Sequence, residues 1–401
     1  MKHLLLTLSL LTSFFASAQI VNIPDANFKN ALLNYNPPID TNNDGEIQVS
    51  EAEAVNVLDL SYKNIADLTG IQAFTNIYRL NCNTNLLTQL DISENLELLY
   101  LEVKNNLLTT LDVTNNIQLI SLDCDHNQLT SLDISNNSSL TNLFCHNNML
   151  TSLNISQNPS LIWLICGQNP LSTLDVSQNL NLEWIEAYTN QLTEIDVSNN
   201  INLTDLNVSD NQLTSLDVSQ IPNLDALSFL ANEISYINVS NNPALRVLQC
   251  KDNQLTNIDV SQNSELVILT CGNNPISFID VSQNDGLEGI EFSNTLISEI
   301  DLSNNPLLCG VEGNNNFSLN YVNIKNGNNP ELISSNCFAR HFMDSSLNFL
   351  NSPNLQFICV DDANFAAANF TEVSPNATFI DNCTIANGDL NHITGTNNLR
   401  R

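Results

Sequence analysis

The sequence predicts a right-handed solenoid, mostly parallel β, of about 13 short coils with a small helical cap at one end and an irregular, disulfide-closed cap at the other. Three observations predict this fold class: a pattern that returns at a constant step along the chain, apolar residues at fixed inward positions, and an asparagine that closes nearly every repeat. A fixed period of about 20 to 50 residues is the signature of stacked repeats.

The repeat is clearest in the middle of the chain, where LTSLDISNNSSLTNLFCHNN (129–148) returns as LTSLNISQNPSLIWLICGQN (150–169). Counting from Cys82 in steps of 21, each repeat has Leu, Ile or Val two residues before the counted position. Three residues after it stands asparagine in eleven of twelve repeats, and Thr295 is the exception. The counted positions are Cys82, Val103, Cys124, Cys145, Cys166, Ala187, Val208, Phe229, Cys250, Cys271, Phe292 and Gly313.

In the half-repeat LxxLxCxxN, apolar residues alternate with polar ones, which predicts a short strand with one face inward. The asparagine amide is suited to bonding backbone groups of the neighbouring coil, and the cysteines are interpreted as small buried hydrophobes. The other half, LxxLDVSxN, has no helical period and is predicted to be a second strand-like segment. Stacking buries the apolar faces. A longer first unit starts at Val57, and about 13 coils at ~4.8 Å give an array roughly 60 Å long.

These repeats resemble those of bacterial secreted leucine-rich repeat proteins. The first coil is similar to that of internalins, and the 21-residue coils resemble the nested pattern LxxLxCxxNxLxxLDVSxN. The resemblance implies a leucine-rich repeat horseshoe over residues 55–330. It says little about function, because proteins with these repeats bind many different partners.

The segment before the repeats, residues 19–54, is predicted to be a helical cap that contains a calcium loop. Residues 40–51, DTNNDGEIQVSE, match the EF-hand-like pattern D-x-N-x-D-G-x-I-x-x-x-E. Hard oxygen donors at this spacing suit a structural Ca²⁺, and the alternative is an Asp/Asn/Gly turn without metal. The candidate ligands are the side chains of Asp40, Asn42 and Asp44, the backbone carbonyl of Glu46, Gln48 through a water molecule, and Glu51 as a bidentate ligand.

Both ends of the chain have features of a secreted protein. Residues 1–18 are predicted to be a signal peptide, because an apolar run is followed by the small residues ASA. Residues 331–383 resemble the closing segment behind such arrays in secreted bacterial proteins, which makes Cys359 and Cys383 a candidate disulfide. Cys309 and Cys337 are a further candidate pair. Residues 384–401 are interpreted as a linker or as the start of a β domain that the sequence lacks.

Outward positions of the first strand are not set by the core, so candidate ligand-binding residues lie there. The only two tryptophans, Trp163 and Trp184, are one repeat apart and occupy the same outward position in adjacent coils. Exposed aromatic clusters are typical of protein-binding hot spots, and their rings also suit sugars. The alternative is that the two rings only pack on each other or under a loop. The other candidate residues are Tyr100, Phe144, Ile165 and Tyr188, bordered by His126, His146 and Glu186.

The second half of the coils carries a column of aspartates, from Asp91 to Asp301. Ser or Thr stands two residues after each position of this column. In-register coils would place these carboxylates about 4.8 Å apart, with a repulsion of about 3 kcal/mol at a protein surface. We expect hydrogen bonds from Ser hydroxyls and backbone N–H groups to offset it. The column is therefore interpreted as structural, with a cation-, mineral- or ice-binding face as the alternative.

The charge balance excludes some classes of partner. The chain has 43 acidic and 11 basic residues and a net charge of −32, which argues against nucleic acid and anionic membranes. After the signal peptide, no apolar run reaches the ~18 residues of a membrane span. The sequence has no H-E-x-x-H, G-x-S-x-G, P-loop or G-x-G-x-x-G motif, so no catalytic residue is proposed.

Taken together, these features predict a monomeric, non-enzymatic protein that is secreted or attached to the cell surface. It would bind a protein or glycan on a cell surface through its concave face, in adhesion or in host or biofilm contact. One alternative is a structural or matrix solenoid that uses the Asp/Ser column. Another is a stalk that displays a further C-terminal domain.

Overall fold

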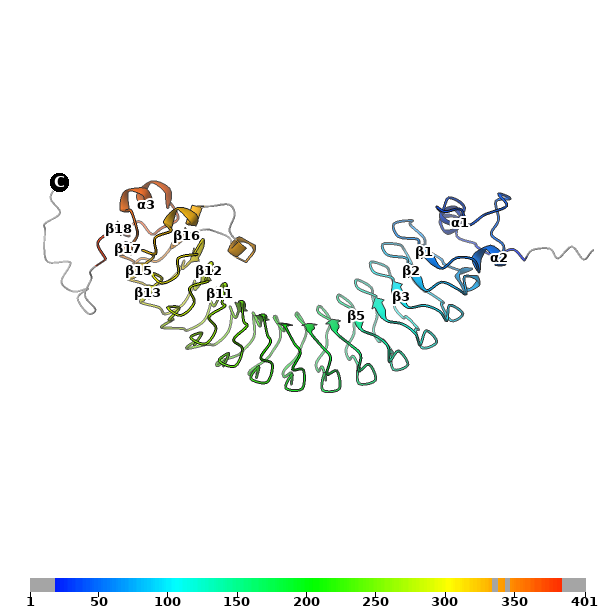
Figure 1. Cartoon of the computed structure of the whole chain (residues 1–401), viewed down its shortest axis with the longest axis horizontal. Coiled ribbons are helices and arrows are strands. Elements are labelled where there is room, and N and C mark those ends of the chain that lie inside the picture. The colour runs from blue at the N-terminus through cyan, green and yellow to red at the C-terminus, as the bar shows by residue number, and fades with distance from the viewer. Residues whose placement is uncertain (1–18, 334–337, 343–346, 384–401) are drawn as a thin grey trace, which may run out of the picture.

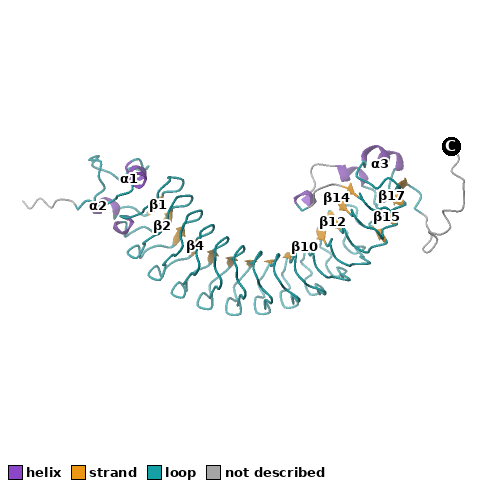
Figure 2. Ribbon diagram, turned by 180° about the vertical axis from the view of Figure 1, so that it is seen from behind, coloured by secondary structure: helices purple, strands orange, loops and turns teal. Residues whose placement is uncertain are grey.

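The chain forms one long, curved solenoid (Figure 1), seen here in a computed structural model that describes residues 19–333, 338–342 and 347–383. Fourteen short strands make a parallel sheet along the inner side of the arc, the concave face (Figure 2). In sheet order these strands are β1 (Val57–Asp59), β2 (Arg79–Asn81), β3 (Tyr100–Glu102), β4 (Ser121–Asp123), β5 (Asn142–Phe144), β6 (Trp163–Ile165), β7 (Trp184–Glu186), β8 (Asp205–Asn207), β9 (Ala226–Ser228), β10 (Val247–Gln249), β11 (Ile268–Thr270), β12 (Gly289–Glu291), β14 (Gly310–Glu312) and β16 (Leu347–Asn348).

The concave sheet has one strand more than the 13 coils counted in the sequence. Val311 of β14 pairs with Leu347 of β16, so this step along the chain is longer than the regular one. The extra residues carry two short 3₁₀ helices, η2 (Asn329–Ile333) and η3 (Phe338–His341). This interruption breaks the period, and for that reason a count at a fixed step stops before the last coil.

The second half of the coils pairs as β-strands only toward the C-terminal end of the array. There, a four-stranded parallel sheet contains β13 (Glu299–Asp301), β15 (Tyr321–Asn323), β17 (Phe357–Cys359) and β18 (Thr378–Ile380). In the other described coils this segment is extended without strand pairing, apart from a single bridge between Asp112 and Asp133. The prediction of a second strand is wrong for those coils, where asparagine side chains take up carbonyl groups of the neighbouring coil.

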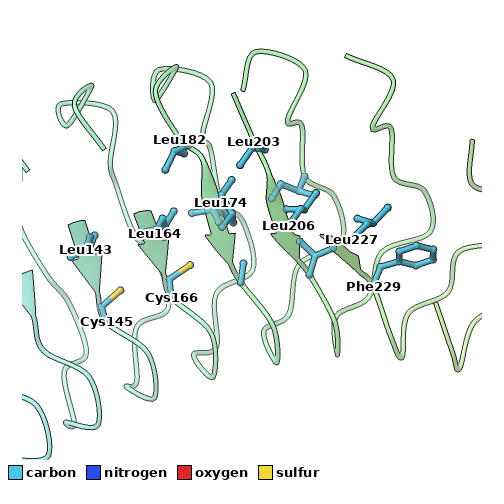
Figure 3. Packing of buried hydrophobic residues seen from close by; sticks show 14 of the residues in the cluster. Leu143, Cys145, Leu164, Cys166, Leu174, Leu182, Leu203, Leu206, Leu227 and Phe229 are labelled. Carbon is cyan, nitrogen blue, oxygen red and sulfur yellow. The ribbon is translucent and has the colours of Figure 1, made fainter. Parts of the chain in front are cut away.

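The core is a stack of identical inward positions. Leu143 and Leu164 lie directly above one another in register, and so do Cys145 and Cys166 (Figure 3). All four are fully buried. The repeat cysteines are not in disulfides, and burial, with help from Glu186, raises the pKa of Cys166 to about 12. As predicted, these thiols pack as small apolar groups.

Buried asparagines hold the coils together. The Asn148 amide donates to the carbonyls of Cys124 and Cys145, at 3.0 and 3.1 Å, and its Oδ1 accepts from the N–H of Leu129 at 3.0 Å. A second column bridges the convex side, where Asn158 donates to the carbonyls of Ile134 and Asn137. The prediction that asparagine bonds the backbone of the neighbouring coil is confirmed.

The residue before the first asparagine adopts a positive φ in every regular coil. Ala231 has φ 49° and Gln168 has φ 50°. Residues other than glycine seldom occupy this region of backbone conformation. The conformation is kept because it aims the next residue, the asparagine, at the carbonyls that it bonds. His126 also occupies this turn position, at φ 53°.

The N-terminal cap contains α1 (Ala26–Leu33) and α2 (Val49–Ala52), and η1 (Ile71–Ala73) follows in the first coil. Asp25 caps α1 and also accepts from the N–H groups of Ala66 and Asp67, which fastens the helix to that coil. The Tyr35 hydroxyl accepts from the Asp59 N–H at 2.8 Å, so it covers the open edge of β1.

The C-terminal cap is closed by α3 (Ala363–Asn369) and by the predicted disulfide between Cys359 and Cys383, whose Cα atoms are 5.7 Å apart. Cys309 is also disulfide-bonded. Its predicted partner, Cys337, lies outside the described residues, as do residues 1–18 and 384–401. Among the described residues, no helix is long and apolar enough to cross a membrane.

Replacing Asn148 with Ala is expected to lower the free energy of unfolding by about 3 kcal/mol or more, because one buried N–H and two buried carbonyls lose a partner. Urea unfolding followed by far-UV circular dichroism measures this change. Gln157→Ala is the control in the second half of the same coil, since its exposed amide bonds only Ser156; it should change stability by no more than about 0.5 kcal/mol. Equal losses in the two variants would contradict a special role for the buried amide.

Candidate functional site on the concave face

An aromatic patch lies at the middle of the concave face. Trp163 and Trp184 begin β6 and β7 and pair directly in register. Their ring centroids are 6.5 Å apart at 56°, and Phe144 meets Trp163 edge-on at the same distance. The tryptophans are 44% and 38% exposed, so their contact with each other leaves much of both rings in solvent.

The other predicted residues divide between this patch and its surroundings. Ile165 is half-buried between Phe144 and Glu186 in the neighbouring strands. Glu186 accepts a hydrogen bond from the indole N–H of Trp184 at 3.0 Å. Tyr100 belongs to β3, three strands from Trp163 and therefore about 14 Å away, so it is exposed but separate from the patch.

A polar chain borders the patch along the turns that follow the strands. The hydroxyl of Tyr188 lies 3.1 Å from Nδ1 of His146, whose ring is 5.1 Å from that of His126. Gly167 stands between Tyr188 and His146, and a Cβ there would lie 2.9 Å from the tyrosine ring. The glycine therefore lets the tyrosine cross one coil to reach the histidine.

This chain continues to a buried carboxylate. Asp125 accepts from the backbone N–H of His146 at 2.7 Å and lies 3.5 Å from Lys104 Nζ. Burial lowers the pKa of His146, with Asp125 acting in the opposite direction, which favours the neutral imidazole at physiological pH. Among the described residues, no group of three His, Cys, Asp or Glu side chains could hold a metal ion. The two histidine rings contact each other, and His146 is hydrogen-bonded to Tyr188.

A groove of about 310 Å³ extends from Trp184 along β8, β9 and β10. Its far wall is Phe342, which follows η3. Ala339 of η3 packs on Ile268 and Cys309, so the interruption of the repeat folds onto the concave face (Figure 1). Sequence reasoning missed this wall, since the only signal was the loss of period after Gly313. The floor of the groove is formed by Asn207, Ala226, Ser228, Val247 and Gln249.

The 40–51 loop has the backbone of a tight ion-binding turn. Gly45 has φ 81° and its N–H donates to Asp40 Oδ2, while Asn42 Oδ1 accepts from the Asp44 N–H. Ile47 is buried, and its carbonyl accepts from the Val21 N–H at 2.8 Å.

Two carboxylates of this loop are relevant to metal binding. Asp40 is 9% exposed, and its Oδ1 is buried without a partner among the described residues. Glu51 is oriented by Thr41 and by the N–H of Gln48, both within the loop. A buried oxygen without a donor is an arrangement that a cation would satisfy. The loop fits Ca²⁺ only when its amide and backbone oxygens are counted with its carboxylates, since no three acidic, His or Cys side chains among the described residues form a metal site by themselves.

Comparison with solved structures identifies the fold. No protein-family model matches the sequence, and no curated protein matches it. A functional domain of InlJ from Listeria monocytogenes aligns with a TM-score of 0.66 at 28% identity, over 90% of this chain and 77% of that chain. InlF of the same species aligns with a TM-score of 0.68 at 21% identity, over 75% and 92%. The plant peptide hormone receptor RGFR1, in complex with RGF2, aligns with a TM-score of 0.59 at 18% identity, over 78% and 57%.

The chain has a leucine-rich repeat fold. Its solved neighbours include internalins, in agreement with the resemblance of the repeats. The InlJ domain is described as including a cysteine ladder. In this leucine-rich repeat array, Cys124, Cys145 and Cys166 likewise follow one another at the inward position of successive coils, and all three are buried.

Carboxylates on two faces of the array have opposite pKa shifts. We call the surface that carries the aspartate column the lateral face. There, each Asp of the column accepts a hydrogen bond from the N–H of the Ser or Thr two residues on, as Asp175 does from Ser177 at 2.9 Å. The side chain and backbone of Ser177 lower the pKa of Asp175, so the predicted hydrogen bonds are present. On the concave face, burial and then Asp125 raise the pKa of Asp123 to about 6, and burial and then Asp225 raise that of Asp205.

Replacing Asp123 with Asn is expected to stabilise the protein at pH 7.5 by about 1–2 kcal/mol. Because the folded-state pKa is raised to about 6, the protonated carboxyl favours folding below about pH 4, and this advantage is lost as the pH rises through 6. The stabilising effect should therefore vanish near pH 4 in urea unfolding experiments.

The matched control for this experiment is Asp91→Asn on the lateral face. Ser93 lowers the pKa of Asp91, so its contribution is present at neutral pH and is lost as the pH falls through the folded-state pKa. This variant should be less stable than the original protein at pH 7.5. An effect of the same sign for both substitutions would contradict the electrostatic difference between the two faces.

Proposed function

We propose that this chain is a secreted, non-enzymatic binding protein that recognises a partner macromolecule on a cell surface through its concave face. Trp163 and Trp184 form the centre of the contact, and the partner is a protein in preference to a glycan. Adhesion to a host or within a biofilm is the role that such a protein would serve.

The exposed aromatic patch is the observation that supports this proposal. Two tryptophans that are about 40% exposed, side by side on a rigid sheet, leave a large apolar area in water. Burying the exposed part of these side chains against a partner contributes about 25 cal/mol for each Å² of apolar surface, and tryptophan is enriched among the residues that dominate binding energy. A neighbour with a similar fold, the plant peptide hormone receptor RGFR1, was solved in complex with RGF2, which supports a binding role in general.

The two alternatives have less support. A matrix or cation-binding role would use the Asp column, but its carboxylates already accept hydrogen bonds from the Ser positions two residues on. Their charge is thereby partly satisfied within the coil. A display stalk would place no demand on the concave face and offers no reason for its aromatic residues.

The 40–51 loop would hold a structural Ca²⁺ in support of this function. Asp40, Asn42, Asp44, Glu46, Gln48 and Glu51 are the proposed ligands. The ion would cross-link the loop from Asp40 to Glu51 at the start of α2, next to the first coil. A single loop of this kind suits an extracellular affinity of about 10⁻⁴ to 10⁻³ M.

Trp163→Ala combined with Trp184→Ala should weaken partner binding by about 100-fold. Before the partner is known, tryptophan emission and acrylamide quenching report the same contact. We expect red-shifted, readily quenched emission from the free protein and protection by the protein fraction of a cell-surface extract.

The control pair is Asp196→Asn with Asp217→Asn, which removes two charges from the lateral face and should leave the protection intact. Blue-shifted emission that resists quenching and ignores every extract would contradict the proposed contact. Retention of a cell-surface fraction by the immobilised protein that is lost in the Asp pair variant and kept in the tryptophan pair variant would support the matrix alternative.

Calcium at 5 mM should stabilise the protein by about 1–2 kcal/mol over the protein in EDTA, if the dissociation constant is about 0.5 mM. Thermal unfolding and hydrogen exchange at α1 and α2 measure the effect. Asp40→Asn should abolish it, whereas Asp59→Asn, an exposed carboxylate outside the loop, should preserve it. A melting curve that is the same in calcium and EDTA, with no bound metal by elemental analysis, would reduce the loop to a turn.

A further inference from the structure

The groove between Trp184 and Phe342 combines aromatic walls with acidic residues. It follows the aromatic patch directly, because Trp184 belongs to both. Its volume of about 310 Å³ is at the lower end of the range for small-ligand sites and is suited to one or two long side chains. Register pairing places Trp184, Asp205, Ala226 and Val247 in one row across it.

We propose that this groove receives lysine or arginine side chains from a basic segment of the partner protein. The inference rests on the proposed function and names the chemistry of the partner at that same face. The alternative occupant, a neutral oligosaccharide, is treated below as an outcome of the test.

The first argument is the charge of the lining. Of the described residues that line the groove, Glu186 and Asp205 are acidic and none is basic. The nearby Arg246 faces Asp225 at 3.7 Å, so it is already matched with a carboxylate. With a net charge of −32, the whole chain also attracts a basic partner at long range.

The second argument is the incomplete solvation of Asp205. It accepts a hydrogen bond from Thr204 Oγ1 at 2.7 Å. It is half-buried, and burial followed by repulsion from Asp225 raises its pKa. A cation placed beside this carboxylate would relieve both the desolvation and the repulsion, in contrast to the lateral aspartates, whose hydrogen bonds lower their pKa.

The third argument is the pair of aromatic walls. The Trp184 ring is 38% exposed, and its N–H is bonded to Glu186, which adds negative charge beside the ring. Phe342 is fixed at the other wall by edge contact with Phe338, at 5.3 Å between centroids. Aromatic faces attract ammonium and guanidinium groups within about 6 Å and also pack on their aliphatic stems. A neutral sugar could stack on Trp184 but would leave the two carboxylates without a counter-charge.

The test uses residues 19–401 with Trp163→Phe, so that Trp184 is the only tryptophan. The probes are acetyl-tetraarginine amide, acetyl-tetraglutamate amide and a neutral tetrasaccharide of N-acetylglucosamine, at 150 mM salt. We expect saturable change in Trp184 emission and protection from acrylamide with tetraarginine alone. Asp205→Asn should raise its dissociation constant at least tenfold.

The control is Asp196→Asn, which removes the same charge from the lateral face and should change the dissociation constant less than twofold, since screening limits its reach to about 8 Å. Equal losses in the two variants would overturn the proposal, because binding would then reflect net charge alone. Saturation by the tetrasaccharide with no response to tetraarginine would overturn it in favour of a glycan. A single cooperative thermal transition and an unchanged far-UV circular dichroism spectrum show that the variants fold.

This outcome is separable from that of the proposed function. If tetraarginine fails while Trp184→Ala still abolishes retention of a cell-surface fraction by the immobilised protein, the concave face binds a partner of another chemistry and only the groove inference falls. If the protein without either tryptophan also retains every fraction as well as the original protein does, both fall together.

Discussion

The buried asparagine amide is the interaction on which the rest of this structure depends. One coil of the array cannot form a core alone, and its polar turns would bury backbone groups without partners. The Asn148 side chain answers both needs, since it bonds carbonyls of its own coil and of the previous one, and also an N–H. Because the same bonds recur from coil to coil, the strand spacing is uniform. That uniformity brings Trp163 and Trp184 into register, although neither contributes to the core.

The two faces of the array handle their negative charge differently, and this difference bears on function. Lateral aspartates receive hydrogen bonds within their own coil, as Asp196 does from Ser198, so their charge is stabilised without a ligand. Asp123 and Asp205 on the concave strands are partly buried and stand near other carboxylates, which raises their pKa. The concave face thus retains electrostatic free energy that a cationic partner can lower. Charge count alone cannot reveal this, because both faces are rich in aspartate.

The period of the sequence is sufficient to predict the concave strands, their register and the aromatic patch, because each follows from one backbone unit repeated at a fixed step. Contacts between side chains do not follow from it. The bond between Tyr188 and His146 needs the space left at Gly167, and the groove needs Phe342, which arrives from an aperiodic segment. The second strand was overpredicted, since an extended pattern does not show whether backbone or asparagine amides bond the next coil. The calcium ligands and the concave contact remain predictions.

The segment between β14 and β16, which breaks the period of the sequence before the last coil, also limits where a partner can bind. Outward residues are exposed or half-buried from β2 to β10, but all are buried on β11, β12 and β14, where η3 packs on the sheet. The accessible surface therefore ends at Phe342, and a partner centred on Trp184 meets the groove at that boundary. The inward columns of the array scarcely vary. The choice of binding partner must therefore be determined by the outward side chains and by interruptions of this kind. The rigid register then favours binding, because little of the face must be ordered on contact.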